Sequence, residues 1–271
     1  MIKNYLKTAW RNVLKNKAFS IINLLGLSIG ISVCFIIMLF VQDELSYDRF
    51  NVKADRIVRV LFQSNVNGGK INEATVMPPT AAALKTDYPE VQEATRLHAA
   101  GKPKVNYGDK KFNDGEFAFV DANFFSVFTI HFLKGDPATA LQQPNTLVIT
   151  NDFAKKYFGN EDPVGKTLGF NNNSELYKIT GVIDKIPANA HFHFDMFGSM
   201  GGYSEAKSDS WMTSNFFTYL VLQEGYDYKK LEAKLPHVFL YHAGQFGFQL
   251  FVIVAFLQHE VGKKIRRHPA I

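Results

Sequence analysis

The pattern of apolar and charged residues sets the start of the chain apart from the rest. Residues 18–41 form an uninterrupted uncharged run, AFSIINLLGLSIGISVCFIIMLFV. A helix needs about 20 apolar residues to cross the hydrocarbon core of a membrane. A cleaved signal peptide would have a shorter apolar region, of about 7–15 residues, followed by a small-residue cleavage site. We therefore expect a retained transmembrane helix over residues 18–41.

The segment before this run, residues 1–17, has a second pattern. Apolar residues recur at helical spacing, whereas Lys3, Lys7, Arg11 and Lys15 recur every four residues on another face. Such a basic amphipathic helix suits an anionic membrane surface. Because cytoplasmic flanks carry the excess of Lys and Arg, we expect the N-terminus in the cytoplasm and the chain from about residue 42 outside it.

The predicted transmembrane helix contains a G-x-x-x-G pattern, formed by Gly26 and Gly30. Small residues at this spacing let membrane helices approach closely. We expect these two glycines to face another membrane helix, either from the same assembly or from a second copy.

The following region, residues 42–235, mixes short β-rich runs with helical ones. The predicted strands are Arg56–Phe62, Phe117–Val120, Thr146–Thr150, Leu176–Ile183 and Phe216–Leu222. The predicted helices are Thr80–Thr86, Asp121–Phe128, Asp152–Phe158 and Tyr228–Leu235, of which the second and third open with acidic caps. No strict strand–helix repeat is present, so the sequence predicts an α+β domain and not a doubly wound sheet.

Composition narrows the classes of function. The chain has a formal net charge of +5, which the cations of residues 1–17 account for. The basic balance therefore reflects membrane topology and does not indicate nucleic-acid binding. The single cysteine, Cys34, lies in the predicted transmembrane helix, so the outer domain is expected to fold without disulfides.

Residues 159–167, GNEDPVGKT, superficially match a phosphate-binding loop. The pattern requires four residues between the first glycine and Gly-Lys-Thr, and this segment has one too many. Its Glu161 and Asp162 would repel phosphate, and Pro163 lacks an amide donor. We interpret the segment as a helix end at 157–159, a turn at Asp162-Pro163 and then a strand.

His191, His193 and Asp195 alternate, which would place them on one face of a strand, where they could bind a transition metal. Two close histidines are more often ordinary surface residues, and no further ligand cluster accompanies them. No serine lies in a nucleophile elbow, and the acidic pairs lie in turns. We expect no catalytic residue, metal or cofactor, and hence no enzyme.

Several stretches of the outer region share a family likeness: Val120–Phe128, Phe132–Pro137, Val148–Thr150, Ala154–Gly159 and Asp162–Lys166. They resemble the periplasmic core domain of MacB-type, FtsX-like ABC transporter permeases. The opening Trp10-Arg11-Asn12, with Asn16-Lys17, resembles the entry of the same permeases. The likeness covers roughly residues 1–235.

The resemblance implies a fold and a role. It implies a mixed α/β periplasmic domain of two lobes, inserted after the first membrane helix of an inner-membrane efflux or mechanotransmission system. A separate cytoplasmic ABC ATPase would supply the energy, and other permease helices, or a second permease copy, would be partners beside membrane lipid. Asp162, Pro163, Gly165 and Lys166 would form a structural signature turn of the family.

The likeness stops near Leu235, and residues 236–271 form an atypical tail. A candidate second span covers 238–257, diluted by His242 and Gln245. Because the family has three more spans after the outer domain, we expect the chain to be a truncated subunit. Two alternatives remain: a stand-alone membrane-anchored binding or sensor module, and a non-functional fragment.

Overall fold

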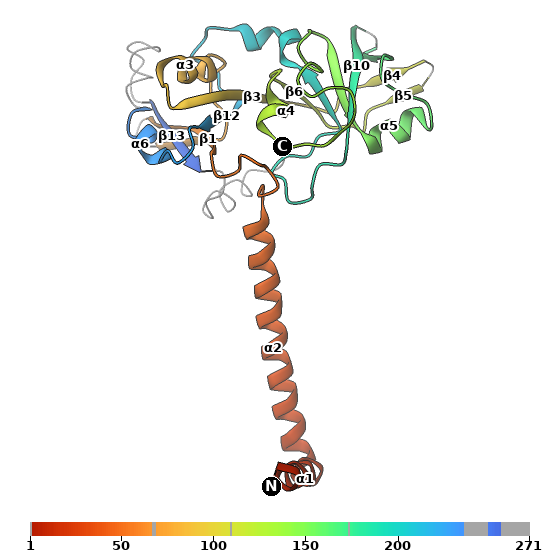
Figure 1. Ribbon diagram of the computed structural model, residues 1–271, viewed down its shortest axis with the longest axis vertical. Coiled ribbons are helices and arrows are strands. Elements are labelled where there is room, and N and C mark those ends of the chain that lie inside the picture. Colours follow the sequence, from red (N-terminus) through yellow and green to blue (C-terminus); the bar gives the residue numbers. More distant parts are fainter. Residues whose placement is uncertain (1, 67–68, 109, 173, 236–248, 256–271) are drawn as a thin grey trace. The chain divides into compact units, whose positions relative to one another are not determined.

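The computed structural model describes residues 2–66, 69–108, 110–172, 174–235 and 249–255 (Figure 1). The chain divides into two compact units, residues 1–46 and residues 47–271. Each unit is described by itself.

The first unit consists of two helices separated by a bend at Asn16, α1 (Ile2–Lys15) and α2 (Lys17–Ser46). None of the residues of α2 is buried, and its most apolar stretch has a mean hydropathy of 2.7. Within the described part of the chain, α2 is the one helix long and apolar enough to cross a membrane. The predicted span, 18–41, lies within it, and the helix continues to Ser46.

The second unit is built on one mixed sheet whose described strands run in the order β13-β1-β12-β3-β6-β11-β8-β10-β9-β4-β5. Two further strands, β2 and β7, pair with β1 and β10. Only the β10–β8 and β11–β6 pairs among these are parallel. The strands are β1 (Ile57–Val66), β2 (Gly69–Glu73), β3 (Val91–Gly101), β4 (Val105–Tyr107), β5 (Lys110–Phe112), β6 (Phe117–Val120), β7 (Phe132–Lys134), β8 (Thr146–Thr150), β9 (Thr167–Phe170), β10 (Glu175–Ile183), β11 (Met196–Ser199), β12 (Phe217–Leu222) and β13 (Gln249–Ala255).

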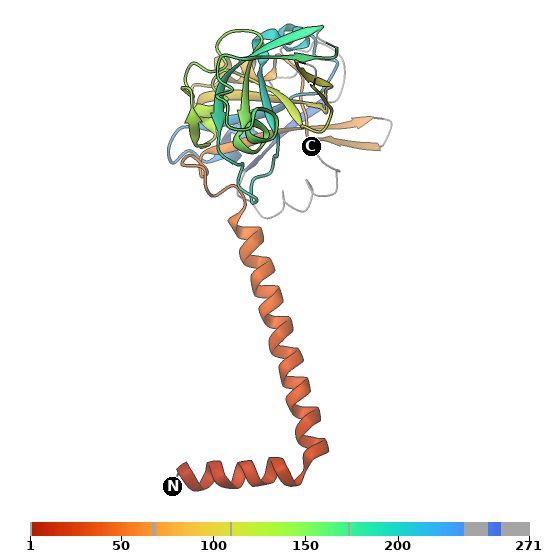
Figure 2. The ribbon, with the colours of Figure 1, turned by 90° about the vertical axis from the view of Figure 1, so that its right-hand side faces the viewer.

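Alternation along the strands assigns apolar side chains to both faces of the sheet. In β6, Ala118 and Val120 join one core, and Phe117 and Phe119 join another on the opposite face. The first core runs along the middle of the sheet and receives the short helix α4 (Phe124–Val127). The β1–β2 hairpin (orange in Figure 2) projects from the sheet.

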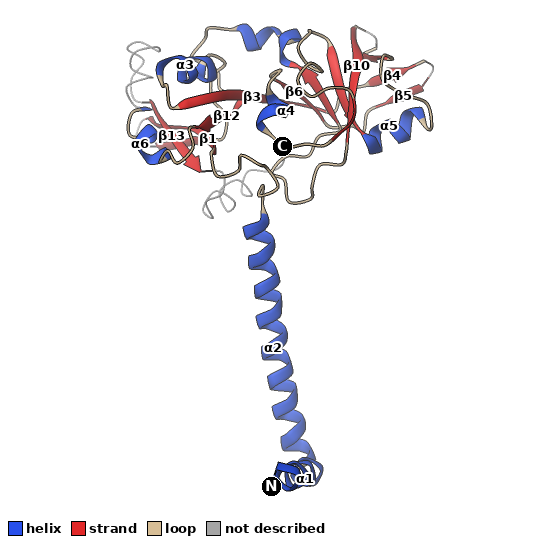
Figure 3. Cartoon of the chain, in the orientation of Figure 1, coloured by secondary structure: helices blue, strands red, loops and turns tan. Residues whose placement is uncertain are grey.

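The opposite face carries two separate cores, one toward each end of the sheet. One includes Leu84 of α3 (Thr80–Asp87) and Leu231 of α6 (Tyr228–Glu232). The other is covered by α5 (Asn151–Phe158), and Figure 3 shows these helices at the two ends. These two cores correspond to the expected two lobes of an α+β domain, which share one sheet.

Some of the predicted helices and strands agree with the structure more closely than others. Strands β6 and β8 have the predicted bounds, and β1, β10, β12 and the predicted helices overlap theirs. The longest strand, β3, was not predicted at all. Its sequence, VQEATRLHAAG, has no regular alternation, because polar side chains lie on both faces of this strand: Thr95 is buried, whereas Arg96, on the other face, is bonded to Asp121.

The tail differs from its candidate role as a second span. Its described residues, Gln249–Ala255, form β13, which pairs antiparallel with β1 from Val58 to Ser64. These seven residues are therefore a strand and not part of a membrane helix. The remainder of the candidate span, 238–248 and 256–257, lies outside the described residues.

Candidate functional site

The basic residues predicted for the membrane surface lie on α1. Lys3, Lys7, Arg11 and Lys15 are all exposed, and apolar residues such as Tyr5 and Trp10 are exposed on the same helix. The helix thus offers both cationic and apolar side chains to its surroundings. Its role at a membrane surface or beside an ATPase stays a prediction.

The predicted packing residues lie on α2. A Cβ atom added at Gly26 or Gly30 would meet nothing within 4 Å, so neither glycine serves packing within the unit. Together with Cys34, one and two turns further on, they line a shallow groove that also includes Leu27, Ile31, Phe35 and Met38. Contact with another helix at this groove stays a prediction.

The predicted signature turn follows α5, which is capped at its C-terminal end by Gly159, with a φ of 63°. The turn is closed by Asp162, whose Oδ1 accepts from the amide of Val164 at 3.1 Å. Gly165 adopts a φ of 88° and donates its amide to Ile179 O at 2.8 Å. Only glycine takes this conformation without strain, and the close backbone contact fastens the turn to β10.

The charged residues of this turn fasten it further. Asp162 pairs with Lys134 of β7 at 3.0 Å, and Lys166 pairs with Glu161. The Lys166 ammonium also lies over the rings of Phe158 and Tyr107, at 5.2 and 5.5 Å. The cation is thus engaged by a carboxylate and two aromatic faces, which gives it a structural use inside the domain.

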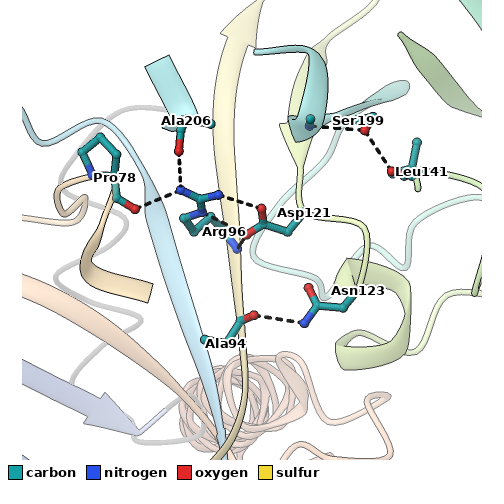
Figure 4. A network of polar contacts seen from close by, with 9 residues as sticks. Pro78, Ala94, Arg96, Asp121, Asn123, Leu141, Ser199 and Ala206 are labelled. Atoms are coloured by element: carbon teal, nitrogen blue, oxygen red, sulfur yellow. Dashed lines mark hydrogen bonds and ion pairs between the residues drawn. The ribbon is translucent and has the colours of Figure 1, made fainter. Parts of the chain in front are cut away.

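A polar network is centred on Arg96 of β3 (Figure 4). Its Nε and Nη2 donate to the two carboxylate oxygens of Asp121, each at 3.0 Å. Its Nη1 donates to Pro78 O and to Ala206 O, both at 2.9 Å. Pro78 precedes α3 in one lobe, and Ala206 belongs to the core of the other. One guanidinium therefore ties together segments of both lobes.

Asp121 was expected to cap a helix, and this expectation is wrong. Its carboxylate accepts from the amide and the guanidinium of Arg96, and α4 begins later, at Phe124. A bidentate pair with arginine is stronger than a neutral hydrogen bond, which explains the preference for Arg96 over a helix end. The acidic residue at the start of α5 is likewise no cap, because Thr150 Oγ1 accepts from the Phe153 amide.

The residues beside this network hold the neighbouring turns. Asn123 donates its side-chain amide to Ala94 O at 3.0 Å, and Ser199 donates its hydroxyl to Leu141 O at 2.9 Å (Figure 4). Tyr203 stacks on both His98 and Phe119, with ring centroids 4.7 Å apart in each case. These ring contacts hold the segment between β11 and β12 against the sheet.

The two histidines and the aspartate that could have formed a metal site have different partners in the structure. His191, His193 and Asp195 precede β11 and do not belong to a strand, contrary to the expectation. The side chain of His191 is buried and bonds to Asp48, whereas Asp195 Oδ2 accepts from the amide of Glu116. Among the described residues, no three His, Cys, Asp or Glu side chains are grouped to hold a metal ion.

Another arginine, Arg59 of β1, is buried and was not singled out from the sequence. It is 1% exposed, donates from Nη2 to Ala74 O at 3.0 Å and lies over the ring of Phe217. Its Nε and Nη1 have no hydrogen-bond partner among the residues that the structure describes. Burial lowers the pKa of this guanidinium. The sequence signal for a buried arginine was its position on an apolar strand, where alternation predicts a core residue and not a charge.

These contacts hold segments of the domain together, and comparisons with known proteins place the chain in a family. Residues 20–238 match the family described as the MacB-like periplasmic core domain. This chain belongs to that family. The match covers most of the chain and includes most of the apolar helix α2 as well as the domain that follows.

Solved structures similar to the chain show the same fold. A domain of a candidate permease protein from Porphyromonas gingivalis matches with a TM-score of 0.68 at 20% identity, covering 76% of this chain and 91% of that one. The periplasmic region of MacB from Actinobacillus actinomycetemcomitans matches with a TM-score of 0.56 at 15% identity, covering 80% and 95%.

A third similar structure is the extracellular domain of the noncanonic ABC-type transporter YknZ from Gram-positive bacteria. Its TM-score is 0.53 at 11% identity, with coverage of 73% of this chain and 99% of that one. A search of the curated proteins found no match. The chain thus combines a MacB-like periplasmic domain of the ABC-permease type with an N-terminal apolar helix, as in a membrane-anchored protein with an extracytoplasmic domain.

Proposed function

We propose that the chain is a membrane subunit of an ABC-type export or mechanotransmission system. In this proposal α2 crosses the inner membrane, and the domain from Tyr47 onward engages substrate or envelope partners outside the cytoplasm. A separate cytoplasmic ABC ATPase supplies the energy, and the chain itself catalyses no reaction. The observation that carries the proposal is the family match over residues 20–238, which includes the helix and the domain together.

The structure supports the non-catalytic part through the use of its charged groups. Arg96 and Asp121 join two lobes, and Lys166 is engaged within the signature turn. These groups act on other parts of the domain, which suits a body that transmits or receives movement.

The orientation is tested with reporters fused after Gly225, in an exposed turn. Alkaline phosphatase at this position is expected to be active, and a cytoplasm-dependent fluorescent reporter is expected to be dark. A matched variant with Lys3, Lys7, Arg11, Lys15 and Lys17 changed to Glu should reduce or invert both signals, because orientation follows the excess of Lys and Arg. The opposite result in the unaltered chain would overturn the assigned orientation.

The partner is tested by co-purifying the full chain in detergent with the ABC ATPases of its source organism. Retention of one ATPase is expected, and it should weaken when Lys7 and Arg11 on the exposed face of α1 are changed to Glu. A folded chain that retains none of them would favour a stand-alone membrane-anchored binding or sensor module.

A further inference from the structure

The chain enters the domain through a short exit segment, Asp48–Lys53, which begins two residues after α2 ends. Backbone bonds attach it to two loops: the Asp48 amide donates to Asn189 O at 2.8 Å, and the Val52 amide donates to Thr129 Oγ1 at 2.9 Å. The Thr129 amide returns a bond to Asn51 Oδ1 at 2.9 Å. Both Asp48 and Asn51 are buried, which is unusual for polar residues in a connecting loop.

Asp48 makes the most specific contacts of the exit segment. It adopts a φ of 58°, a left-handed conformation that aspartate and asparagine tolerate better than most residues. Its Oδ1 accepts from the backbone amide of His191 at 3.1 Å and lies 3.0 Å from Nδ1 of the same residue. The backbone conformation thus directs a carboxylate inward onto one histidine.

His191 continues the contact into the sheet. A carboxylate only accepts hydrogen bonds, so Nδ1 carries the proton and Nε2 is left as an acceptor. Nε2 lies 2.6 Å from the hydroxyl of Tyr219, which therefore donates to it. Tyr219 lies in β12, between β1 and β3, and is 1% exposed. Three side chains thus connect the exit segment with the interior of the sheet.

The surroundings fix this connection in place. The ring of Phe128 packs edge-on against Tyr219, with centroids 5.0 Å apart, and Arg59 is the cross-strand partner of Tyr219. Lys53 Nζ donates to Ser126 O at 2.7 Å, next to the same loop. The chain Asp48–His191–Tyr219 therefore passes through a packed region whose side chains have little room to rearrange.

We propose that Asp48, His191 and Tyr219 are positioning residues that form a mechanical anchor for the membrane helix. A pull on the chain at Ser46 is transmitted through Tyr47 to Asp48, and the contacts of Asp48 with His191 and of His191 with Tyr219 carry it to β12. Without the anchor, Phe50 would still pack against the middle core and Asn51 and Val52 would still bond to Thr129, but the first residue of the exit segment would lose its side-chain attachment to the sheet. The inference rests on the proposed function, in which α2 moves and the domain responds.

The local part of the proposal is tested by hydrogen exchange on the full chain in lipid nanodiscs. Asp48→Asn keeps the left-handed preference and removes the charge, and Tyr219→Phe removes only the hydroxyl. Each is expected to speed exchange of residues 48–57 by about tenfold, the effect of losing one charge-assisted or buried hydrogen bond. Asp55→Asn and Tyr203→Phe are the matched controls, and α5 is the internal reference.

The double variant decides whether the three residues act as one chain. Asp48→Asn with Tyr219→Phe should speed exchange little more than either change alone, because residues in one network are not additive. The proposal is overturned by unchanged exchange in both single variants, by additive effects, or by equal acceleration in α5, which would report general destabilisation.

The mechanical part is tested by force spectroscopy on the full chain in detergent. With Cys34→Ser, handles are attached at Ser46→Cys and Glu224→Cys. The force that first detaches the exit segment should fall in Asp48→Asn, whereas the force that unfolds the rest of the domain should not. Equal detachment forces in both chains would overturn the anchor. Because no ATPase is present, this result is independent of the partner test above.

Discussion

Two arginines on opposite faces of one sheet show two ways of placing a cation in the domain: the Arg96 side chain is partly buried, and Arg59 is fully buried. Arg96 of β3 has Asp121 and two backbone carbonyls as acceptors. Arg59 of β1 faces the middle core and has one backbone carbonyl and an aromatic ring. Within the described part of the chain, the first cation has a carboxylate partner and the second has none.

This difference shows under which conditions a charge in the interior stabilises the fold. A buried cation offsets its desolvation only when a carboxylate and further hydrogen bonds surround it. The Arg96 network meets this condition and joins two lobes, so the domain depends on it. Arg59 does not meet it, so its burial costs stability that other contacts supply. It lies opposite Tyr219, a member of the proposed anchor.

The largest expected effect follows from removing the paired cation. Arg96→Met should lower the free energy of unfolding by about 3 kcal/mol, because it leaves Asp121 without its cation and two carbonyls without donors. The measurement is urea unfolding of the full chain in detergent, followed by Trp211 fluorescence in a Trp10→Phe background. A loss below about 1 kcal/mol would contradict the role given to the network.

The next effect concerns His191, beside Arg59. Burial lowers the pKa of His191, and the charges of Arg59 and His193 lower it further. Its bond to Asp48 acts in the opposite direction and raises the pKa. The hydroxyl of Tyr219 also faces the ring. In the unfolded state the pKa of His191 is near 6.5, so below that pH the unfolded chain binds more protons than the folded chain. The stabilisation is full above about pH 6.5 and is lost as pH falls through the lowered folded pKa.

This pH dependence is measured by unfolding the chain between pH 7.5 and 5.5. His191→Gln should flatten the slope by up to about 1.4 kcal/mol per pH unit relative to the unaltered chain. Arg59→Met should flatten it partly, because one repelling charge is gone. Identical slopes in all three chains would show that His191 does not titrate in this range.

A smaller effect is expected from removing the unpaired cation. Arg59→Met keeps most of the side-chain volume, so the free energy of unfolding should stay unchanged or rise by up to about 1 kcal/mol. The variant loses the contacts with Ala74 and Phe217, but it also removes the cost of burying a charged guanidinium, and the two effects offset each other. A loss as large as that of Arg96→Met would break the comparison between the two arginines.

The smallest effect provides the exposed reference for both arginines. Glu161→Gln removes the carboxylate partner of Lys166 on the surface, where ion pairs contribute little. No measurable change in unfolding is expected, because water solvates the exposed Glu161 and Lys166 keeps its contacts with the rings of Phe158 and Tyr107. A clear loss would mean that the signature turn depends on its surface charges as well as on the backbone contact of Gly165.

The sequence located the elements whose local pattern and tertiary surroundings agree. Strands β6 and β8 are short apolar runs flanked by turn residues, and both were predicted with their observed bounds. The end of α5 at Gly159 and the turn at Asp162-Pro163 were also predicted, and the structure confirms them. Glycine and proline restrict the backbone wherever they occur, so these positions require no knowledge of distant partners.

The partners of buried polar side chains could not be predicted in this way. Asp121 has the local signature of a helix cap, yet it binds Arg96, 25 residues earlier. His191 alternates with His193 as a surface pair would, yet it is enclosed by Asp48 and Tyr219. Each contact joins residues far apart in sequence, and local pattern carries no information on such distances.

By itself, the sequence determined the long apolar helix, the charge that precedes it, the mixed class of the domain and its family. These follow from length, hydrophobicity and turn residues, which act locally along the chain. Only the tertiary structure decided that one sheet joins both lobes, that Arg96 ties them together and that Asp48 connects the exit segment to β12. The physical reason is that a buried charge is stabilised by whichever group the fold places beside it, and the fold alone makes that choice.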